Sequence, residues 1–407
     1  MPAESLQAKR ARGRGIFLIL PLLIAVGAGA YWWWSTHPAA PTTVSLTPTD
    51  FASLPGWDSN DPRAALASFR RSCGAITKLP ATRAMGTYGG TAGDWQGACN
   101  TVPASPSSAA SARHFFETWF TPVAVAGDGL FTGYYEPELK ASRTRHGAYQ
   151  TPIYGLPSDL VSVDLGQFKP ELAGVHIEGK LTGHTLTPYP TRAEIDAKGV
   201  AAQTLFYAED PIAVFFLHVQ GSGRVRLEDG SSLRVAYAGQ NGRPYTPVGR
   251  TLIEQGDLAR GSVSLQSIRD WLKSHPDKMR DVLESDQSFV FFQEKPVGDA
   301  SLGSDGSEGV ALTPGASLAV DAHLHPLGAP FYVATTSSDT EAGKSVPLLQ
   351  RLLIAQDTGG AIRGPVRGDV FWGFGPPAEE MAGRMTSRGR FYVLLPKPVA
   401  VRLAPQS

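Results

Sequence analysis

Three aspartates in the last third of the chain stand where apolar runs meet loops. Asp321 ends "GASLAVD", Asp357 ends "LLIAQD" and Asp369 opens "DVFWGF". Carboxylates cost free energy in apolar surroundings unless they are paired or hydrogen-bonded, although aspartate is also common in plain turns. If these runs are neighbouring strands, we expect an acidic cluster at one mouth of a β-barrel. The turn-forming interpretation stays open for Asp321 and Asp357.

A carboxyl cluster in a partly apolar cleft suits acid catalysis. Like charges and desolvation both raise the pKa of a carboxyl, so one aspartate can stay protonated near neutral pH. Such a group can protonate a glycosidic oxygen. Trp372, Phe374, Tyr134 and Tyr135 offer ring faces for sugars. Because Tyr134 and Tyr135 are adjacent in an expected strand, only one of them should face the groove.

Two other functions fit the same residues. In "DAHLH", Asp321, His323 and His325 follow at i, i+2 and i+4, which on a strand places them on one face, as a metal-dependent hydrolase would need. The second alternative is a non-catalytic β-barrel that binds polysaccharide in a groove without cleaving it.

The chain has no net charge, so its composition gives no general attraction to nucleic acid. Residues 1–34 combine a basic flank, about twenty apolar residues and a tryptophan cluster. They predict a cytoplasmic flank with a signal anchor, or a signal peptide cleaved after Ala30. The remainder is then expected on the periplasmic side of the membrane, or in the periplasm or at the outer membrane after cleavage. Residues 35–54, rich in proline, threonine and serine, predict a linker.

The chain has two cysteines, Cys73 and Cys99. In an exported protein we expect them to form a disulfide. Closing so short a loop stabilises a fold by about 3 kcal/mol in the chain-entropy model. A free reactive thiol is the alternative, but no histidine–asparagine signature accompanies either cysteine.

Short apolar runs separated by glycine turns dominate from Leu130 onward, and they favour a β-barrel over a doubly wound sheet. The runs at 213–242 and 243–253 are expected to be strands, with a hairpin turn at 228–231. The helices that the sequence predicts lie at 62–76, 105–120, 264–276, 276–285 and 376–385.

Five stretches carry a resemblance to a known family. They are "FTGYYEP" (131–137), "HVQGSGRVRL" (218–227), "YTPVGRTLI" (245–253), "AVDAHLHPLGAPFYV" (319–333) and "AQDTGGAIRGPVRGDVFWGFG" (355–375). Together, and in this order, they resemble the membrane-bound lytic murein transglycosylase A family, and the last two resemble its C-terminal three-aspartate (3D) domain. The resemblance covers most of residues 55–400. The family's best-known members are lipoproteins, whereas here no cysteine follows the apolar run.

The resemblance implies a mainly β fold. Residues 45–136 plus 287–403 would form a catalytic double-psi β-barrel, and residues 137–286 an inserted β-barrel domain, with a groove between them. The implied reaction cleaves the β-1,4 bond between N-acetylmuramic acid and N-acetylglucosamine, leaving 1,6-anhydromuramoyl ends, without a cofactor. The resemblance implies peptidoglycan glycan strands as the partner. The N-terminal segment predicts contact with the cytoplasmic membrane, and other cell-wall enzymes are further expected partners.

The resemblance also implies roles for single residues. Asp369 would be the catalytic acid and base, supported by Asp357 and Asp321. For "QGSG" a plain turn remains the alternative. The residues expected to line the groove are Thr132, Gly133, Tyr134, Tyr135, Gln220, Gly221, Ser222, Gly223 and Trp372.

Overall fold

The computed structural model describes residues 44–105, 107–172, 175–335 and 349–403. The expected signal segment, 1–34, lies outside the described residues, and within them no helix is long and apolar enough to cross a membrane. In the overlap of the expected linker, 35–54, with the expected barrel range, 45–136, β1 (Leu46–Pro48) pairs with β2 (Phe120–Glu136). A 3-10 helix, η1 (Phe51–Ser53), follows β1.

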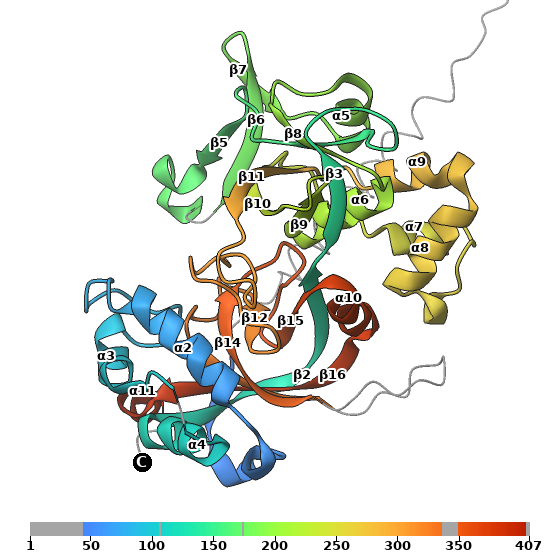
Figure 1. Ribbon diagram of the computed structural model, residues 1–407. Helices are drawn as coiled ribbons and strands as arrows, with labels where there is room; N and C mark the ends of the chain where they lie inside the picture. The colour runs from blue at the N-terminus through green and yellow to red at the C-terminus, as the bar shows by residue number, and fades with distance from the viewer. Residues whose placement is uncertain (1–43, 106, 173–174, 336–348, 404–407) are drawn as a thin grey trace, which may run out of the picture. The chain divides into compact units, whose positions relative to one another are not determined.

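A closed barrel forms the first part of the fold (Figure 1). In the described part of the chain its strands follow the order β2-β15-β12-β14-β13-β16, and β16 pairs back onto β2. The β2–β15 and β12–β14 pairs are parallel. This closure confirms the predicted barrel and leaves no free edge between these strands. The other barrel strands are β12 (Ser317–Val320), β13 (Pro330–Thr335), β14 (Gln350–Asp357), β15 (Arg367–Phe374) and β16 (Thr386–Pro396).

Helices pack beside this barrel (Figure 1), with α2 against β14, α4 against β2 and α3 against β16. Helix α2 (Arg63–Ile76) forms because its apolar residues, among them Leu66, Phe69 and Cys73, recur at helical spacing and are buried. The three helices predicted here, at 62–76, 105–120 and 376–385, are confirmed. The elements here are also η2 (Trp57–Ser59), α3 (Ala92–Thr101), α4 (Ala109–Trp119), α10 (Gly375–Arg384) and α11 (Lys397–Leu403).

A second sheet has the strand order β11-β10-β9-β3-β8-β4. A bridge between Gly155, directly after β4, and Phe292 in β11 joins its two outer strands. The predicted turn at 228–231 is confirmed, since it connects the antiparallel strands β9 and β10. The strands are β3 (Glu138–Ser142), β4 (Thr151–Tyr154), β8 (Thr204–Ala208), β9 (Ser222–Leu227), β10 (Ser232–Gln240) and β11 (Val290–Pro296).

Two segments expected to be strands are helices, α6 (Pro211–Gln220) and α7 (Val248–Glu254). A continuous apolar run does not distinguish strand from helix by periodicity. The residues at the two ends of α6 distinguish the helix from a strand. At its start the Asp210 carboxylate accepts a hydrogen bond from the Ile212 amide at 2.8 Å. At its end Gly221 adopts the left-handed conformation, φ 78°, that terminates helices.

Several elements had no prediction, including a third sheet, β5-β6-β7. The predicted helices at 264–276 and 276–285 are confirmed as α8 (Leu265–Ser274) and α9 (Pro276–Glu284). Besides η1, η2, α3, β8 and α11, the elements without a prediction are β5 (Val161–Asp164), η3 (Leu165–Gln167), η4 (Pro170–Leu172), β6 (His176–Thr182), β7 (Thr185–Pro188), α5 (Arg192–Lys198) and η5 (Arg260–Ser262).

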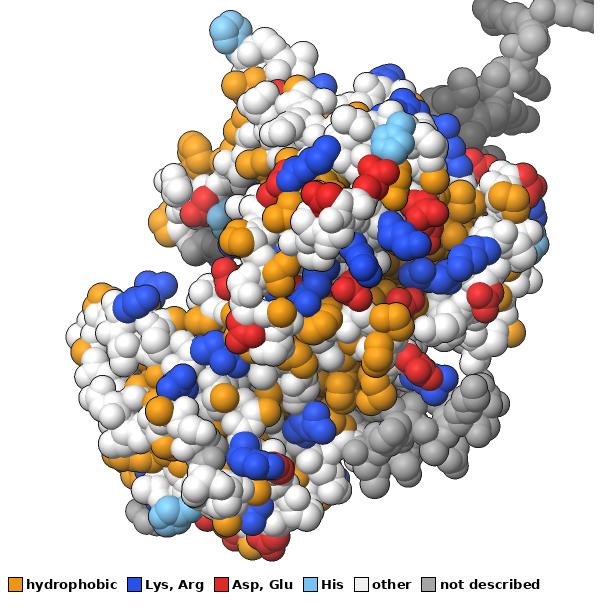
Figure 2. Space-filling view, viewed as in Figure 1, with side chains coloured by type: hydrophobic (Ala, Val, Ile, Leu, Met, Phe, Trp, Pro, Cys, Tyr) orange, Lys and Arg blue, Asp and Glu red, His pale blue; other side chains and the backbone are white. Residues whose placement is uncertain are grey.

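A buried carboxylate at the end of β2 connects the two barrels. Glu136 lies 3.3 Å from the guanidinium groups of both Arg224 in β9 and Arg234 in β10. It also accepts a hydrogen bond from the amide of Ser304 at 2.6 Å. A buried charge is tolerated only with such partners. Elsewhere charged side chains of both signs are interspersed on the surface, as the face in Figure 2 shows.

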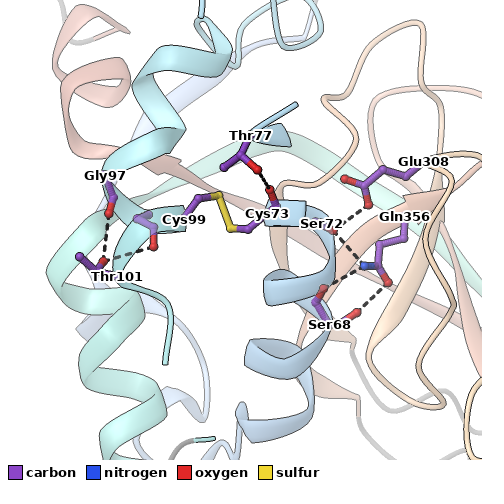
Figure 3. The surroundings of a disulfide bond; sticks show 10 residues. Ser68, Ser72, Cys73, Thr77, Gly97, Cys99, Thr101, Glu308 and Gln356 are labelled. Carbon is purple, nitrogen blue, oxygen red and sulfur yellow. Dashed lines mark hydrogen bonds between the residues drawn. A yellow bond between two sulfur atoms is a disulfide. The ribbon is translucent and has the colours of Figure 1, made fainter. Parts of the chain in front are cut away.

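The predicted disulfide is confirmed, and Cys73–Cys99 joins α2 to α3 (Figure 3). Near it, Ser68 and Ser72 of α2 contact a buried glutamine of β14. The Gln356 amide nitrogen donates to the Ser68 carbonyl at 3.0 Å and to the Ser72 hydroxyl at 2.9 Å. Because Gln356 precedes Asp357, the helix and the disulfide support the strand that ends at that aspartate.

Candidate active site

Asp357 and Asp369 reach one pocket from two strands that are not neighbours. Strand β12 lies between β14 and β15, and its Ala319 is in register with both aspartates. Both aspartates and Ala319 line a pocket of about 390 Å³. The two aspartate-bearing strands are therefore not neighbours, yet both aspartates line the same pocket.

Asp369 has the environment of a group that both gives and takes a proton. Its Oδ1 accepts a hydrogen bond from the Thr132 hydroxyl at 2.7 Å, and that hydroxyl accepts one from Arg367 Nη2 at 2.9 Å. Burial raises the pKa of Asp369 to about 6, against the opposing effects of Thr132 and Arg367, and the charge of Asp357 adds to the rise. A pKa in this range is suited to general acid–base catalysis.

Asp357 is fixed by several donors. Its Oδ2 accepts from the Tyr134 hydroxyl at 2.8 Å, and its Oδ1 accepts from the Ser307 amide at 3.0 Å and the Thr358 amide at 2.9 Å. Burial raises the pKa of Asp357 although these hydrogen bonds oppose the rise. Burial also raises the pKa of Tyr134 well above its ordinary value, so its hydroxyl remains a donor. Asp357 is thus a positioned group beside Asp369.

Asp321 does not join the other two aspartates, so the expected cluster of three is wrong. It follows β12 directly, and its Oδ2 accepts from the Gly364 amide at 2.9 Å while its Oδ1 lies 3.5 Å from Arg363. It is absent from the residues that line the pocket. Asp321 holds the segment after β14, of which residues 358–362 form one pocket wall.

The geometry does not favour a metal-dependent hydrolase. Residues 321–325 form a turn rather than a strand, so they do not share one face. The ring nitrogens of His325 contact the Tyr88 hydroxyl and the Pro365 carbonyl. Among the described residues no group of His, Cys, Asp and Glu could hold a metal ion.

Some of the other residues predicted to line the groove do line the pocket, and others lie outside it. Gly133, Tyr134, Gln220 and Gly221 line the pocket, whereas Thr132 reaches it only through its bond to Asp369. The four residues that lie outside the pocket lining are Tyr135, Ser222, Gly223 and Trp372.

Those four residues have packing roles. Tyr135 is buried with Trp372 against α10, because adjacent residues of β2 point to opposite faces. A Cβ on Gly133 would lie 2.6 Å from Trp372 Cδ1, so this glycine is required for that packing. In the "QGSG" stretch, Gly221 ends α6 and Ser222 begins β9. Gly223 allows a close approach, since its Cβ would lie 2.9 Å from the Pro137 carbonyl.

The pocket wall that contains Gln220 and Gly221 has further residues for which there was no prediction. Two of its aromatic residues are exposed, Tyr237 at 50% and Tyr245 at 43%, and can offer ring faces to a sugar. Strand alternation places Tyr237 on the face of the buried Val235, so it gave no signal for the exposure of Tyr237. The residues of this wall are Arg192, His218, Val219, Tyr237, Gln240, Tyr245, Asp286, Ser288 and Val290.

A carboxyl with a raised pKa, a supporting carboxyl and exposed tyrosines in one pocket define an enzyme of the polysaccharide-cleaving class. The comparisons specify the family. Residues 130–293 match the MltA specific insert domain, and residues 316–395 match the 3D domain. The chain belongs to the membrane-bound lytic murein transglycosylase A family, as the motifs indicated, and its mainly β fold is the fold of that family.

Relatives and solved structures agree with this membership. Membrane-bound lytic murein transglycosylase A of Escherichia coli K12 is 34% identical over 277 residues, 67% of each chain. A membrane-bound lytic murein transglycosylase of Agrobacterium tumefaciens is 34% identical with a TM-score of 0.76, covering 88% of this chain and 100% of that one. MltA of Neisseria gonorrhoeae is 32% identical with a TM-score of 0.69, at 88% and 92% coverage. E. coli MltA with bound chitohexaose is 26% identical with a TM-score of 0.61, at 88% and 94% coverage.

Proposed function

We propose that this protein is a peptidoglycan lytic transglycosylase. It cleaves the β-1,4 bond between N-acetylmuramic acid and N-acetylglucosamine and leaves a 1,6-anhydromuramoyl end. The observation that carries the proposal is the carboxyl of Asp369, whose pKa is raised to about 6 in a pocket with exposed tyrosines. The names of the relatives and the chitohexaose complex of one of them support the substrate class.

Asp369 performs both proton transfers in this proposal. Protonated Asp369 gives its proton to the glycosidic oxygen as the bond from that oxygen to C1 of the muramoyl residue breaks. The 6-hydroxyl of the same residue then attacks C1, and its proton returns to the Asp369 carboxylate. The atoms balance without water, and Asp369 regains its starting state.

This reaction needs only one catalytic carboxyl. An ordinary glycosidase uses a second carboxylate as base or nucleophile. Here the nucleophile belongs to the substrate, so its effective concentration is high. Asp357, held by Tyr134, supports Asp369 through its charge, and Thr132 stabilises the Asp369 carboxylate after proton donation.

For location, we propose that the chain acts on the periplasmic side of the membrane. The relatives' names describe them as membrane-bound. The sequence of residues 1–34 fits a signal anchor or a signal peptide. Its glycan-strand partners would then lie in the same compartment.

The test is product analysis in ¹⁸O-labelled water. Purified peptidoglycan is digested with the full-length protein, and the muropeptides are examined by mass spectrometry. We expect products with anhydromuramoyl ends that carry no ¹⁸O. Reducing ends with one ¹⁸O would show a hydrolase, and retained glycan binding without any product would show a non-catalytic binding protein.

A further inference from the structure

Three buried polar residues form part of the unpredicted pocket wall. Arg192 at the start of α5, His218 in α6 and Asp286 after α9 are 4%, 6% and 0% exposed, and all three line the pocket that holds Asp369. Buried polar groups of this kind are expected to have partners. Within the described residues, two side-chain atoms of this trio have no hydrogen-bond partner, His218 Nε2 and Asp286 Oδ2.

The contacts of Arg192 assign the ring proton of His218. Arg192 Nη1 lies 3.0 Å from His218 Nδ1. A guanidinium has donors and no acceptor, so Nδ1 must be the acceptor and the ring proton must sit on Nε2. Arg192 is itself held, because its Nε donates to the Asp286 carbonyl at 3.1 Å and its Nη2 to the Ser288 carbonyl at 2.6 Å.

The remaining ring nitrogen of His218 is an unused donor. Its Nε2 has no hydrogen-bond partner within the described residues, although the side chain is buried and lines the pocket. Burial and the charge of Arg192 lower the pKa of His218 well below its ordinary value, so the imidazole is neutral. His218 therefore carries one fixed N–H, in a residue that lines the pocket, that has no protein partner.

The charges in this wall favour a ligand whose hydrogen-bond acceptor is neutral. Arg192 lies 3.6 Å from the carboxylate of Asp286, so the positive charge is already matched. A substrate carboxylate would meet Asp286 as a like charge, whereas a neutral carbonyl oxygen would not. On an N-acetylated sugar the acetamido carbonyl is such an acceptor. The exposed ring of Tyr245, which also lines the pocket, can cover an adjacent apolar face.

We propose that His218 is a specificity-determining residue whose Nε2–H donates to the carbonyl oxygen of a substrate acetamido group. Arg192 is the positioning residue that holds the imidazole in the required tautomer. This inference rests on the proposed function for the class of ligand in the pocket. It assigns the recognition of 2-acetamido over 2-hydroxy sugars to the inserted barrel rather than to the aspartates.

The experiment measures a ratio of two affinities by calorimetry. Full-length protein carrying Asp369→Asn is titrated with chitohexaose, which has acetamido groups, and with cellohexaose, which has hydroxyls. Adding His218→Met removes the donor at similar volume. We expect the preference for chitohexaose to fall by about tenfold, the effect of one lost hydrogen bond, with cellohexaose affinity unchanged. His218→Gln should restore most of the preference, because its amide can accept from Arg192 and donate to the ligand.

His323→Met is the matched control, since His323 is exposed in the turn after β12, and it should leave the ratio unchanged. A ratio that survives His218→Met in a folded variant would overturn the proposal. A further measurement keeps His218 intact and replaces the acetamido groups of the hexamer by trifluoroacetamido groups, which are weaker acceptors. Weaker binding is expected, and equal or tighter binding would contradict the proposal. A hydrolytic product in labelled water would instead refute the proposed function while leaving this ratio unaffected.

Discussion

Thr132 and Tyr134 lie two residues apart in β2, and each donates a hydrogen bond to a different aspartate. Thr132 binds Asp369 at 2.7 Å and Tyr134 binds Asp357 at 2.8 Å. Residues i and i+2 of a strand share one face, so a single strand holds both carboxyls in place. The proton affinity of Asp369 therefore depends on β2 as well as on burial.

Replacing Asp357 should shift the pH dependence of cleavage. The charge of Asp357 raises the pKa of Asp369, so Asp357→Asn should lower that pKa. Because Asp369 must be protonated to act as the acid, the alkaline limb of the pH–rate profile should move to lower pH. We expect the rate near neutrality to fall by about tenfold or more. A profile that keeps its alkaline limb would contradict this role for Asp357.

Replacing Thr132 should shift the same limb in the opposite direction. The Thr132 hydroxyl stabilises the Asp369 carboxylate and lowers its pKa. Thr132→Val removes that hydrogen bond at nearly constant volume, so the pKa of Asp369 should rise and the alkaline limb should move to higher pH. The measurement is kcat/KM against pH, with Thr132→Ser as the control that keeps the donor.

Glu308 should make stability depend on pH. Its Oε2 accepts from the Ser72 hydroxyl at 2.7 Å, and burial raises its pKa to about 7. The folded state therefore binds this proton more tightly than the unfolded state, and stability should fall as pH rises from about 4.5 to 7. Glu308→Gln imitates the protonated form. It should stabilise the protein at pH 8 by on the order of 1–3 kcal/mol and have little effect at pH 4.

Thermal unfolding of wild type and Glu308→Gln at both pH values tests this prediction. A variant that is less stable than wild type at pH 8 would show that the Glu308 carboxylate contributes favourable interactions that outweigh its burial.

The disulfide should contribute to stability mainly through the unfolded chain. Cys73 and Cys99 are 26 residues apart, and opening such a loop costs about 3 kcal/mol in the chain-entropy model. A reductant should lower the free energy of unfolding of wild type, measured by denaturant titration, by that amount. The same reductant should have no effect on a Cys73→Ser, Cys99→Ser double variant, which controls for other effects of the reagent.

The sequence identified the candidate aspartates, but it did not predict how they are arranged in space. Asp357 ends β14 as expected, because "LLIAQD" is a continuous apolar strand that ends at a turn. The insertion of β12 between β14 and β15 was not predictable, since strand order depends on long-range pairing. For the same reason nothing local showed that Asp321 would bind the Gly364 amide instead of joining the pocket.

The residues His218 and Arg192 of the other pocket wall could not be predicted from the sequence, for a different reason. The run before Gln220, apolar except for His218, shows no clear period, although Asp210, Pro211 and Gly221 carry the end signals of a helix. His218 therefore had no assigned direction. Its partner Arg192 is 26 residues away, and only the tertiary fold brings the two side chains to 3.0 Å.

The central claim is that Asp369 alone performs both proton transfers. Its most direct test is the rate of anhydromuropeptide release from purified peptidoglycan by Asp369→Asn, beside Asp128→Asn, which alters an exposed aspartate of the same strand β2 away from the pocket. We predict that Asp369→Asn loses a factor of about 10²–10⁴ while it still binds the glycan, and that Asp128→Asn keeps the wild-type rate. Release of anhydro products by Asp369→Asn at the wild-type rate would contradict the account.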